Sequence, residues 1–269
     1  MLRCLVRLLV RTYPWLLVIL MVSTSSALAQ ASGIFAGFHG AVSQSDATYG
    51  KTVANTLDDA ATPIAGMSFS TSNSGDGNLA NLGVVAGFRH AWDRQFASVQ
   101  LEASFGAGRV SGFVLGDGVS RERAQYGEAW PETFEVSAST EIGVVGKWGR
   151  ELLSSNWAAI TGVYVLAGIK QSSLELETRY ELGCFMLATC FGPQFSSGEF
   201  EYTAKGQKFV VGGGLEHAFS ERFVAQLELR FESAIEDEWR DSYEDGALTV
   251  NPTLETQDIT FALSLSRFL

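Results

Sequence analysis

Hydrophobic and polar residues alternate along the last thirteen residues of the chain, 257–269. The apolar positions are Ile259, Phe261, Leu263 and Leu265, and the small or polar positions between them are Thr260, Ala262, Ser264 and Ser266. Successive side chains of a β-strand point to opposite faces. This pattern therefore predicts a strand with one apolar face and one polar face.

Seven more segments alternate in the same way or are apolar and rich in glycine. The eight predicted strands are 33–43, 79–91, 95–106, 133–148, 156–170, 206–218, 222–234 and 257–269. Each is long enough for a tilted membrane crossing, which takes about ten residues of strand.

The predicted connections alternate strictly between short and long. The short ones are 90–95, 149–155 and 219–221, and the long ones are 45–78, 107–132, 171–205 and 235–256. This alternation is typical of a barrel with turns on its periplasmic rim and loops on the other. The sequence therefore predicts an all-β fold, an eight-stranded antiparallel up-and-down transmembrane β-barrel with short periplasmic turns and four long extracellular loops.

The polarity of the two strand faces distinguishes this barrel from a soluble, lipocalin-like one, which also has eight antiparallel strands. One face carries no charge, so we expect it to meet lipid, and the other is too polar for a dry core, so we expect it to line the lumen. The outward set is Leu82, Val84, Ala86, Phe88, Ala97, Val99, Leu101, Ala103, Phe105, Val136, Ala138, Ile142, Val144, Phe223, Ala225, Leu227, Leu229 and Phe231. The inward set is Arg89, Gln100, Glu102, Ser104, Glu135, Ser137, Ser139, Glu141, Lys147, Gln226, Glu228, Arg230 and Glu232.

The first 29 residues have the layout of a cleaved secretory signal. Arg3, Arg7 and Arg11 precede an apolar run over 15–22, and Ala27-Leu28-Ala29 provides the cleavage motif before Gln30. We expect residues 30–269 to form a single barrel domain exported through the periplasm to the cell outer membrane. No later apolar stretch approaches the twenty residues of a membrane helix, so insertion must be by strands.

Net charge excludes one class of partner. The chain carries a formal charge of −11, which becomes more negative when the three arginines of the signal are removed. Nucleic acid is not an expected partner, because its phosphates require a basic surface.

The inward charges are the main candidate for chemistry inside the barrel. We expect Glu102, Glu141 and Glu228 at middle depth, Arg230 slightly further out, and Arg89, Lys147 and Glu216 near the periplasmic mouth. Eight strands leave room for little more than side chains, so these groups must pair or hold water. One interpretation is a salt-bridge network that plugs the lumen. The alternative is a narrow, cation-preferring pore, suggested by three carboxylates facing one guanidinium.

Two further residue sets are candidates for chemistry. Cys184 and Cys190 lie in a predicted external loop, and in an oxidising compartment a local disulfide is favoured over free thiols or half a zinc site. His39, His90 and His217 lack a serine with a matching acid, so a lipid-modifying enzyme is the weakest alternative. No catalytic residue, metal or cofactor is expected.

Aromatic residues gather where the short turns begin and end. Trp92, Trp148, Trp157, Phe219 and Phe223 are placed there by the predicted topology. Amphipathic rings prefer the headgroup level, so they predict the periplasmic aromatic girdle.

One further segment, 212–231, carries a family resemblance. It reads Gly212-Gly213-Gly214-Leu215-Glu216-His217-Ala218-Phe219-Ser220-Glu221-Arg222-Phe223, continued by Gln226-Leu227-Glu228-Leu229-Arg230-Phe231. This segment resembles the penultimate hairpin of porin-family outer membrane β-barrel proteins, relatives of the transmembrane domain of outer membrane protein A. His217 and Leu229 stand where that pattern has aromatic residues. The resemblance implies an eight-stranded barrel with a structural, surface-interaction or adhesion role. It also implies outer membrane lipid and lipopolysaccharide as surroundings, and a host or environmental ligand bound through the loops.

The same resemblance assigns a role to the C-terminus. The last strand of that family ends in phenylalanine and is recognised by the barrel-assembly machinery. Here the corresponding residues are Phe261, Leu263, Leu265, Phe268 and Leu269, with Phe268 one place before the end.

Overall fold

The computed structural model describes residues 32–55, 68–117, 128–152, 161–184, 195–220, 222–243 and 248–269. All of its regular structure is β-strand: β1 Gly33–Asn55, β2 Ser68–Trp92, β3 Gln95–Asp117, β4 Glu128–Glu151, β5 Gly162–Cys184, β6 Phe195–Ala218, β7 Phe223–Glu238, β8 Asp241–Tyr243 and β9 Leu248–Phe268. The predicted signal, 1–29, lies outside the described residues. In the part of the chain described, no helix is long and apolar enough to cross a membrane.

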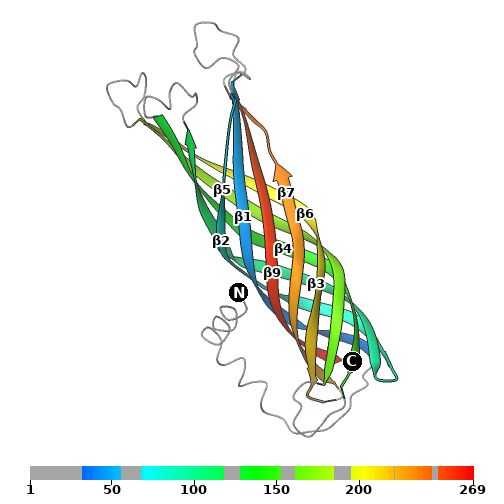
Figure 1. Cartoon of the computed structure of the whole chain (residues 1–269). Coiled ribbons are helices and arrows are strands. Elements are labelled where there is room, and N and C mark those ends of the chain that lie inside the picture. Colours follow the sequence, from blue (N-terminus) through cyan, green and yellow to red (C-terminus); the bar gives the residue numbers. More distant parts are fainter. Residues whose placement is uncertain are drawn as a thin grey trace.

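The strands close into a ring of eight. Each strand from β1 to β7 pairs antiparallel with the next, β7 pairs with β9, and β9 pairs with β1 over 35–55. The short β8 continues from β7 along the upper part of β9. Figure 1 shows the resulting tall barrel of strongly tilted strands, with the C-terminus at its lower end. The predicted fold class is confirmed.

The strands are much longer than predicted, and the connections are correspondingly shorter. Residues assigned to the long loops 45–78, 107–132, 171–205 and 235–256 prove to extend β1 to β7 and β9 at their upper ends. The prediction failed because the outward side chains there are polar, so the apolar alternation used to recognise a strand is absent. In contrast, β5 begins at Gly162 and not at residue 156, and residues 153–160 lie outside the described part.

In the lower part of the barrel, outward side chains are apolar and inward ones polar. Leu101 is 61% exposed, whereas its neighbour Glu102 is 4% exposed and faces the lumen. Val84, Leu227 and Leu263 likewise point outward. The apolar band spans about ten residues of each strand, or about 25 Å of height at a tilt of about 40°. The predicted orientation of these faces is confirmed.

The upper part of the barrel has the opposite polarity. Its outward residues include Gln44, Asn78, Gln171, Gln207 and Gln257, which mark the level of the change, and more polar side chains follow above them. Its interior is an apolar core formed by Ala47, Tyr49, Leu79, Val110, Val114, Phe134, Val136, Leu174, Leu176, Ala204, Ile235 and Leu254. The twelve residues of β1 from 44 onward add about 30 Å of height.

The predicted faces of β4 are wrong above a β-bulge in that strand. The β4–β5 register shifts between Ala138 and Thr140, so the residues above the bulge change sides. Val136, predicted to face lipid, is buried in the upper core, and Glu135, predicted to face the lumen, is partly exposed beside Arg109. Ala138 and Ser137 are both half-buried, so neither takes its predicted side fully. The prediction assumed strict alternation from Lys147 toward the upper end of β4, and this assumption leaves out the extra residue of the bulge.

The barrel wall divides toward its upper end. Pairing between β6 and β7 is limited to 210–218 on β6, and pairing between β2 and β3 ends at Asp76 and Ser111. In Figure 1, the upper ends of β1, β2 and β9 rise together, apart from those of β3 to β6. The upper core therefore lies between two sheets that merge into one ring below.

Hydrogen exchange tests the extended strands. We expect backbone amides of 172–180 in β5 to exchange as slowly as those of 164–170, because both stretches pair with β6 throughout. The measurement is exchange mass spectrometry on the refolded protein. Exchange of 172–180 at the rate of an unpaired peptide would show that the upper wall is loop, as the sequence suggested.

Candidate functional site

The centre of the lumen holds an arginine between two carboxylates. Arg230 of β7 donates to both oxygens of Glu102 on β3, each at 2.7 Å, and its Nε donates to Glu228 at 2.6 Å. Glu228 and Arg230 share the inward face of one strand because they are two residues apart. All three side chains are buried. Such bidentate, charge-assisted contacts are the strongest side-chain hydrogen bonds.

Below this centre, Glu228 also accepts from two other strands. Lys147 Nζ of β4 lies 2.5 Å from Glu228 Oε1, and the Tyr164 hydroxyl of β5 donates to the same oxygen at 2.7 Å. Gln226 Oε1 takes a second bond from Lys147 at 2.7 Å. Glu228 is therefore bound from three directions.

The lowest charged group is centred on Arg89 of β2. Its two terminal nitrogens each donate to Glu216 at 3.0 Å, and one lies 3.5 Å from Glu151. The guanidinium also lies over the Phe96 ring, 3.8 Å from its centroid. The ring covers one face of the cation while the carboxylates occupy its edge.

A second cluster lies above the centre and joins two lysines to three carboxylates. Lys170 and Lys208 are direct cross-strand neighbours on β5 and β6, and Glu232 and Asp258 are neighbours on β7 and β9. Lys170 Nζ lies 2.8 Å from Glu232 and 3.4 Å from Glu141. Lys208 contacts Asp258, and lies 3.5 Å from Glu232 and 3.6 Å from Glu141. Two like-charged pairs thus neutralise each other.

The structure places all seven charges singled out in the sequence in this network: Arg89, Glu102, Glu141, Lys147, Glu216, Glu228 and Arg230. It adds residues that were not singled out: Lys170, Lys208, Glu151, Tyr164 and Asp258. The alternation of faces along β5 and β6 would have placed Lys170 and Lys208 inward, since each lies an even number of residues from an inward residue of its strand. With the added lysines, each of the mid-depth carboxylates Glu102, Glu141 and Glu228 has a cationic partner, so the three no longer face a single guanidinium as the pore alternative assumed.

Glycines leave the space that these long side chains occupy. A Cβ on Gly214 would lie 2.4 Å from the Tyr164 ring, and one on Gly143 would lie 2.5 Å from the Lys170 stem. Tyr164 and Leu166 also face the lumen, where they pack with Phe96, Val145 and Val210. Long side chains thus occupy the space beside these glycines in the lumen.

Apolar clusters lie inside the wall at both ends of the charged lumen. At the lower rim, Phe35, Val85, Ala218, Val224 and Phe268 pack together. Above the charges is the upper core, where Tyr49 donates to Glu132 at 2.9 Å and Lys51 donates to the other oxygen at 2.8 Å. Burial, and then the charge of Glu132, raise the pKa of the Tyr49 phenol.

The remaining predicted residues fall in three places. Phe261, Leu263 and Leu265 face outward, whereas Phe268 faces inward and contacts Phe35 with ring centroids 5.6 Å apart, and Leu269 is exposed. Cys184 ends β5, but Cys190 lies outside the described residues, so the disulfide stays a prediction. His39 is buried in the lumen, and neither of its ring nitrogens has a hydrogen-bond partner within the described part of the chain.

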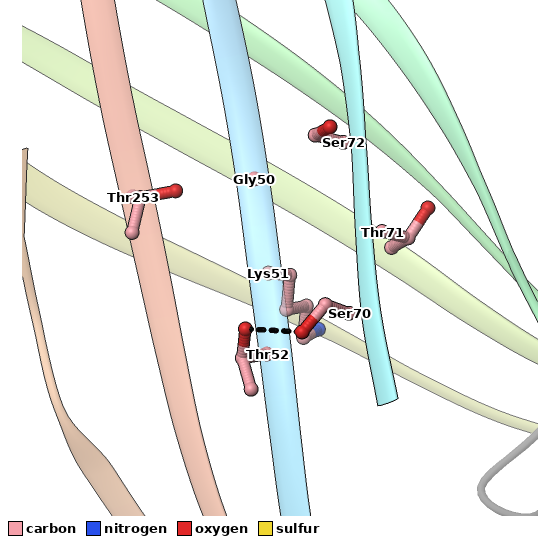
Figure 2. A pocket seen from close by; sticks show the side chains of 7 residues that line it. All are labelled: Gly50, Lys51, Thr52, Ser70, Thr71, Ser72 and Thr253. Atoms are coloured by element: carbon pink, nitrogen blue, oxygen red, sulfur yellow. Dashed lines mark hydrogen bonds between the residues drawn. The ribbon is translucent and has the colours of Figure 1, made fainter. Parts of the chain in front are cut away.

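The outer wall of the upper part carries a hydroxyl-lined groove that the sequence did not indicate. Figure 2 shows Thr52 and Ser70 joined across β1 and β2, with Thr253 on β9 beside Gly50. The groove has a volume of about 240 Å³, and the Thr52–Ser70 hydroxyl distance is 2.8 Å. Gly50 forms its floor, since a Cβ there would lie 2.5 Å from the Thr253 hydroxyl.

A second open groove adjoins the first along the same wall. Its volume is about 530 Å³, and it shares Gly50, Ser72 and Thr253 with the first. The carboxylates of Glu236, Asp237, Glu238 and Glu255 border it. The outer wall therefore offers hydroxyl and carboxylate groups to a polar partner.

No protein-family model matches the chain, and no curated protein matches it. Among solved structures, the attachment invasion locus protein Ail of Yersinia pestis is 10% identical, with 85% of this chain and 99% of that chain covered and a TM-score of 0.24. Neisserial surface protein A is 11% identical, with coverage of 85% and 97% and a TM-score of 0.25. A Pseudomonas aeruginosa FadL homologue is 8% identical, with coverage of 90% and 91% and a TM-score of 0.27. Likenesses at this level carry no argument about function.

The buried arginine should contribute far more to stability than an exposed one. Replacing Arg230→Met leaves Glu102 and Glu228 buried without their guanidinium, which should cost about 3–5 kcal/mol of unfolding free energy. The matched control is Arg109→Met, whose partner Glu135 lies 2.5 Å away in an exposed pair and should cost about 1 kcal/mol or less. Guanidinium unfolding followed by tryptophan fluorescence measures both. Equal losses in the two variants would contradict a buried network.

Proposed function

We propose that this protein is an outer membrane β-barrel with a closed lumen and a structural or surface-interaction role of the adhesion type. One observation carries the proposal, the reversal of polarity along the barrel. Below the level of Gln44 and Gln257 the wall is apolar outside and charged inside, and above it the wall is polar outside and apolar inside. A barrel that passes from lipid into water requires this change.

The apolar band supports placement in a bilayer. Its exposed side chains include Phe38, Leu82, Phe105, Ile142 and Phe209, distributed over different strands around the ring. A continuous exposed apolar surface of this extent is unfavourable in water and favourable in lipid. The closed ring leaves no strand edge within the band, as the hydrocarbon interior requires. The resemblance to the porin family, lipopolysaccharide as neighbour and recognition by the barrel-assembly machinery belong to the same proposal.

The filled lumen supports a closed barrel over the cation-pore alternative. Every buried cation of the network has a carboxylate partner, and apolar clusters lie at the lower rim and in the upper part. An ion would have to displace paired charges and pass the apolar core of the upper part, where nothing replaces its water. The proposed role is also non-enzymatic, because His39 is enclosed within the lumen.

The upper wall supports contact with partners outside the cell. It extends about 30 Å beyond the apolar band and carries the two polar grooves on β1, β2, β7 and β9. A rigid wall of paired strands can present a surface without the ordering cost of a mobile loop. We propose this wall, together with the connections above it, as the binding surface.

Placement and closure can be tested on one preparation. We expect the protein to fractionate with the outer membrane, to migrate differently on gels before and after heating, and to give no single-channel steps in planar bilayers. Recovery in the soluble periplasm would contradict the placement. Reproducible conductance steps from an inserted barrel would contradict closure alone.

The surface role predicts a loss of attachment without a loss of folding. We expect cells displaying Gly50→Val, which fills the hydroxyl groove, or lacking residues 185–194 to attach less to cultured cell monolayers than cells displaying the unchanged protein. The matched control is Thr203→Val, an exposed hydroxyl on β6 outside both grooves. Deleting all of 171–205 is unsuitable, because most of it is β5 and β6. Attachment unchanged in both variants would contradict the proposal.

A further inference from the structure

Four arginines surround the lower rim just beyond the apolar band. Arg150 follows the outward row Ile142, Val144 and Trp148 on β4, and Arg267 follows the corresponding row on β9. Arg94 lies in the β2–β3 turn and Arg222 immediately precedes β7. All four are exposed, and their positions at strand ends and turns place them where the apolar surface ends.

The arginines form two close pairs. Gln95 of β3 pairs with Arg150, and the Glu151 amide donates to the Arg94 carbonyl at 2.7 Å, which makes Arg94 and Arg150 neighbours. On the other side of the rim, Phe223 pairs with Arg267, and the Phe268 amide donates to the Arg222 carbonyl at 2.8 Å. Each pair therefore consists of two arginines whose backbones are neighbours on the rim.

None of these four guanidiniums has an ion pair within the described residues. The arginines that do have one, Arg89, Arg109, Arg179 and Arg230, lie in the lumen or on the upper wall. The rim pairs also lie beside aromatic rings. Arg267 is 5.8 Å from the Phe223 ring centroid, and Gln95, which pairs with Arg150, also pairs with Trp92.

The turn that carries Arg94 has an unusual backbone. Asp93 and Arg94 have φ values of 41° and 65°, the left-handed region that glycine and asparagine favour in two-residue hairpin turns. Arginine is therefore not the residue that turn geometry selects. Its presence at this position agrees with a use for the charge.

We propose that the two arginine pairs bind the phosphate groups of anionic phospholipids in the leaflet at the lower rim. Guanidinium matches phosphate with bidentate hydrogen bonds, and an aromatic ring beside it fits the level where headgroup meets acyl chain. The charge is complementary, because the described residues of the lower turns carry only one exposed carboxylate, Asp93. The inference rests on the proposed membrane placement, and it adds a preference for one lipid class.

Tryptophan quenching by brominated lipids tests the preference at the Arg94–Arg150 pair. Trp92 and Trp148 lie beside this pair and are 37% and 59% exposed. In a background with Trp130, Trp157 and Trp239 replaced by phenylalanine, vesicles contain either brominated phosphatidylglycerol or brominated phosphatidylcholine at equal mole fraction. We expect the anionic lipid to be enriched at the reporters by about threefold or more, and the enrichment to fall with added salt.

Two variants separate the rim from charge in general. Arg94→Gln with Arg150→Gln should bring the two quenching values to equality, whereas Arg109→Gln with Arg179→Gln on the upper wall should leave the preference unchanged. Equal quenching by both lipids in the unchanged reporter protein would overturn the lipid assignment. Loss of preference in the upper-wall variant as well would overturn it too, since the effect would then be one of net charge.

Two further arms test the recognised group and the level of failure. Inorganic phosphate should weaken the preference more than chloride of equal ionic strength does, because it competes for the same guanidiniums, and equal weakening by both anions would overturn recognition of the phosphate group. If neither brominated lipid quenches and heating leaves gel migration unchanged, the barrel has not inserted. That result would contradict the membrane placement itself, whereas quenching without preference contradicts only the lipid inference.

Discussion

Backbone hydrogen bonds close the strands into a ring, and this closure limits where each side chain can lie. Because β1 pairs with both β2 and β9, every strand has two neighbours through the lower part, and each side chain must point either into the lumen or away from the barrel. The polarity of alternate positions therefore decides what surrounds the barrel at each level and what fills it.

This constraint explains why one wall serves two environments. Below Gln44 on β1, apolar side chains point outward and the charges must be accommodated inside, where pairing replaces the water they have lost. Above the same level the apolar side chains turn inward and make a core of the kind found in soluble barrels. The strands themselves continue without a break. The same strands thus form a base with an apolar outer surface and a projection with a polar outer surface, and this shape is the basis of the proposed role in contact.

The narrowness of the ring also explains the composition of the lumen. Charges on eight close strands cannot avoid one another, so Arg230 bridges Glu102 and Glu228, and the neighbours Lys170 and Lys208 meet the neighbours Glu232 and Asp258. Glycines such as Gly143 and Gly214 provide the room that these side chains need. The arginines of the lower rim, Arg94, Arg150, Arg222 and Arg267, lie outside the lumen, at the level where we propose that lipid phosphate binds them.

The fold class and the two faces of the lower strands could be predicted from the residues alone, because an apolar outward face leaves a period of two along the strand. The sequence also identified the central charges Glu102, Glu228 and Arg230 from their position on the polar face. The upper strands were missed because their outward residues are as polar as those of a loop. Val136 and Glu135 were assigned to the wrong sides because a single bulged residue reverses the alternation and leaves no signal of its own. The pairing of Lys208 with Asp258, and the grouping of Arg94 with Arg150, depend on how residues distant in sequence meet around a ring. Which of these residues become neighbours is set by the register of the paired strands, and the register is seen only in the folded barrel.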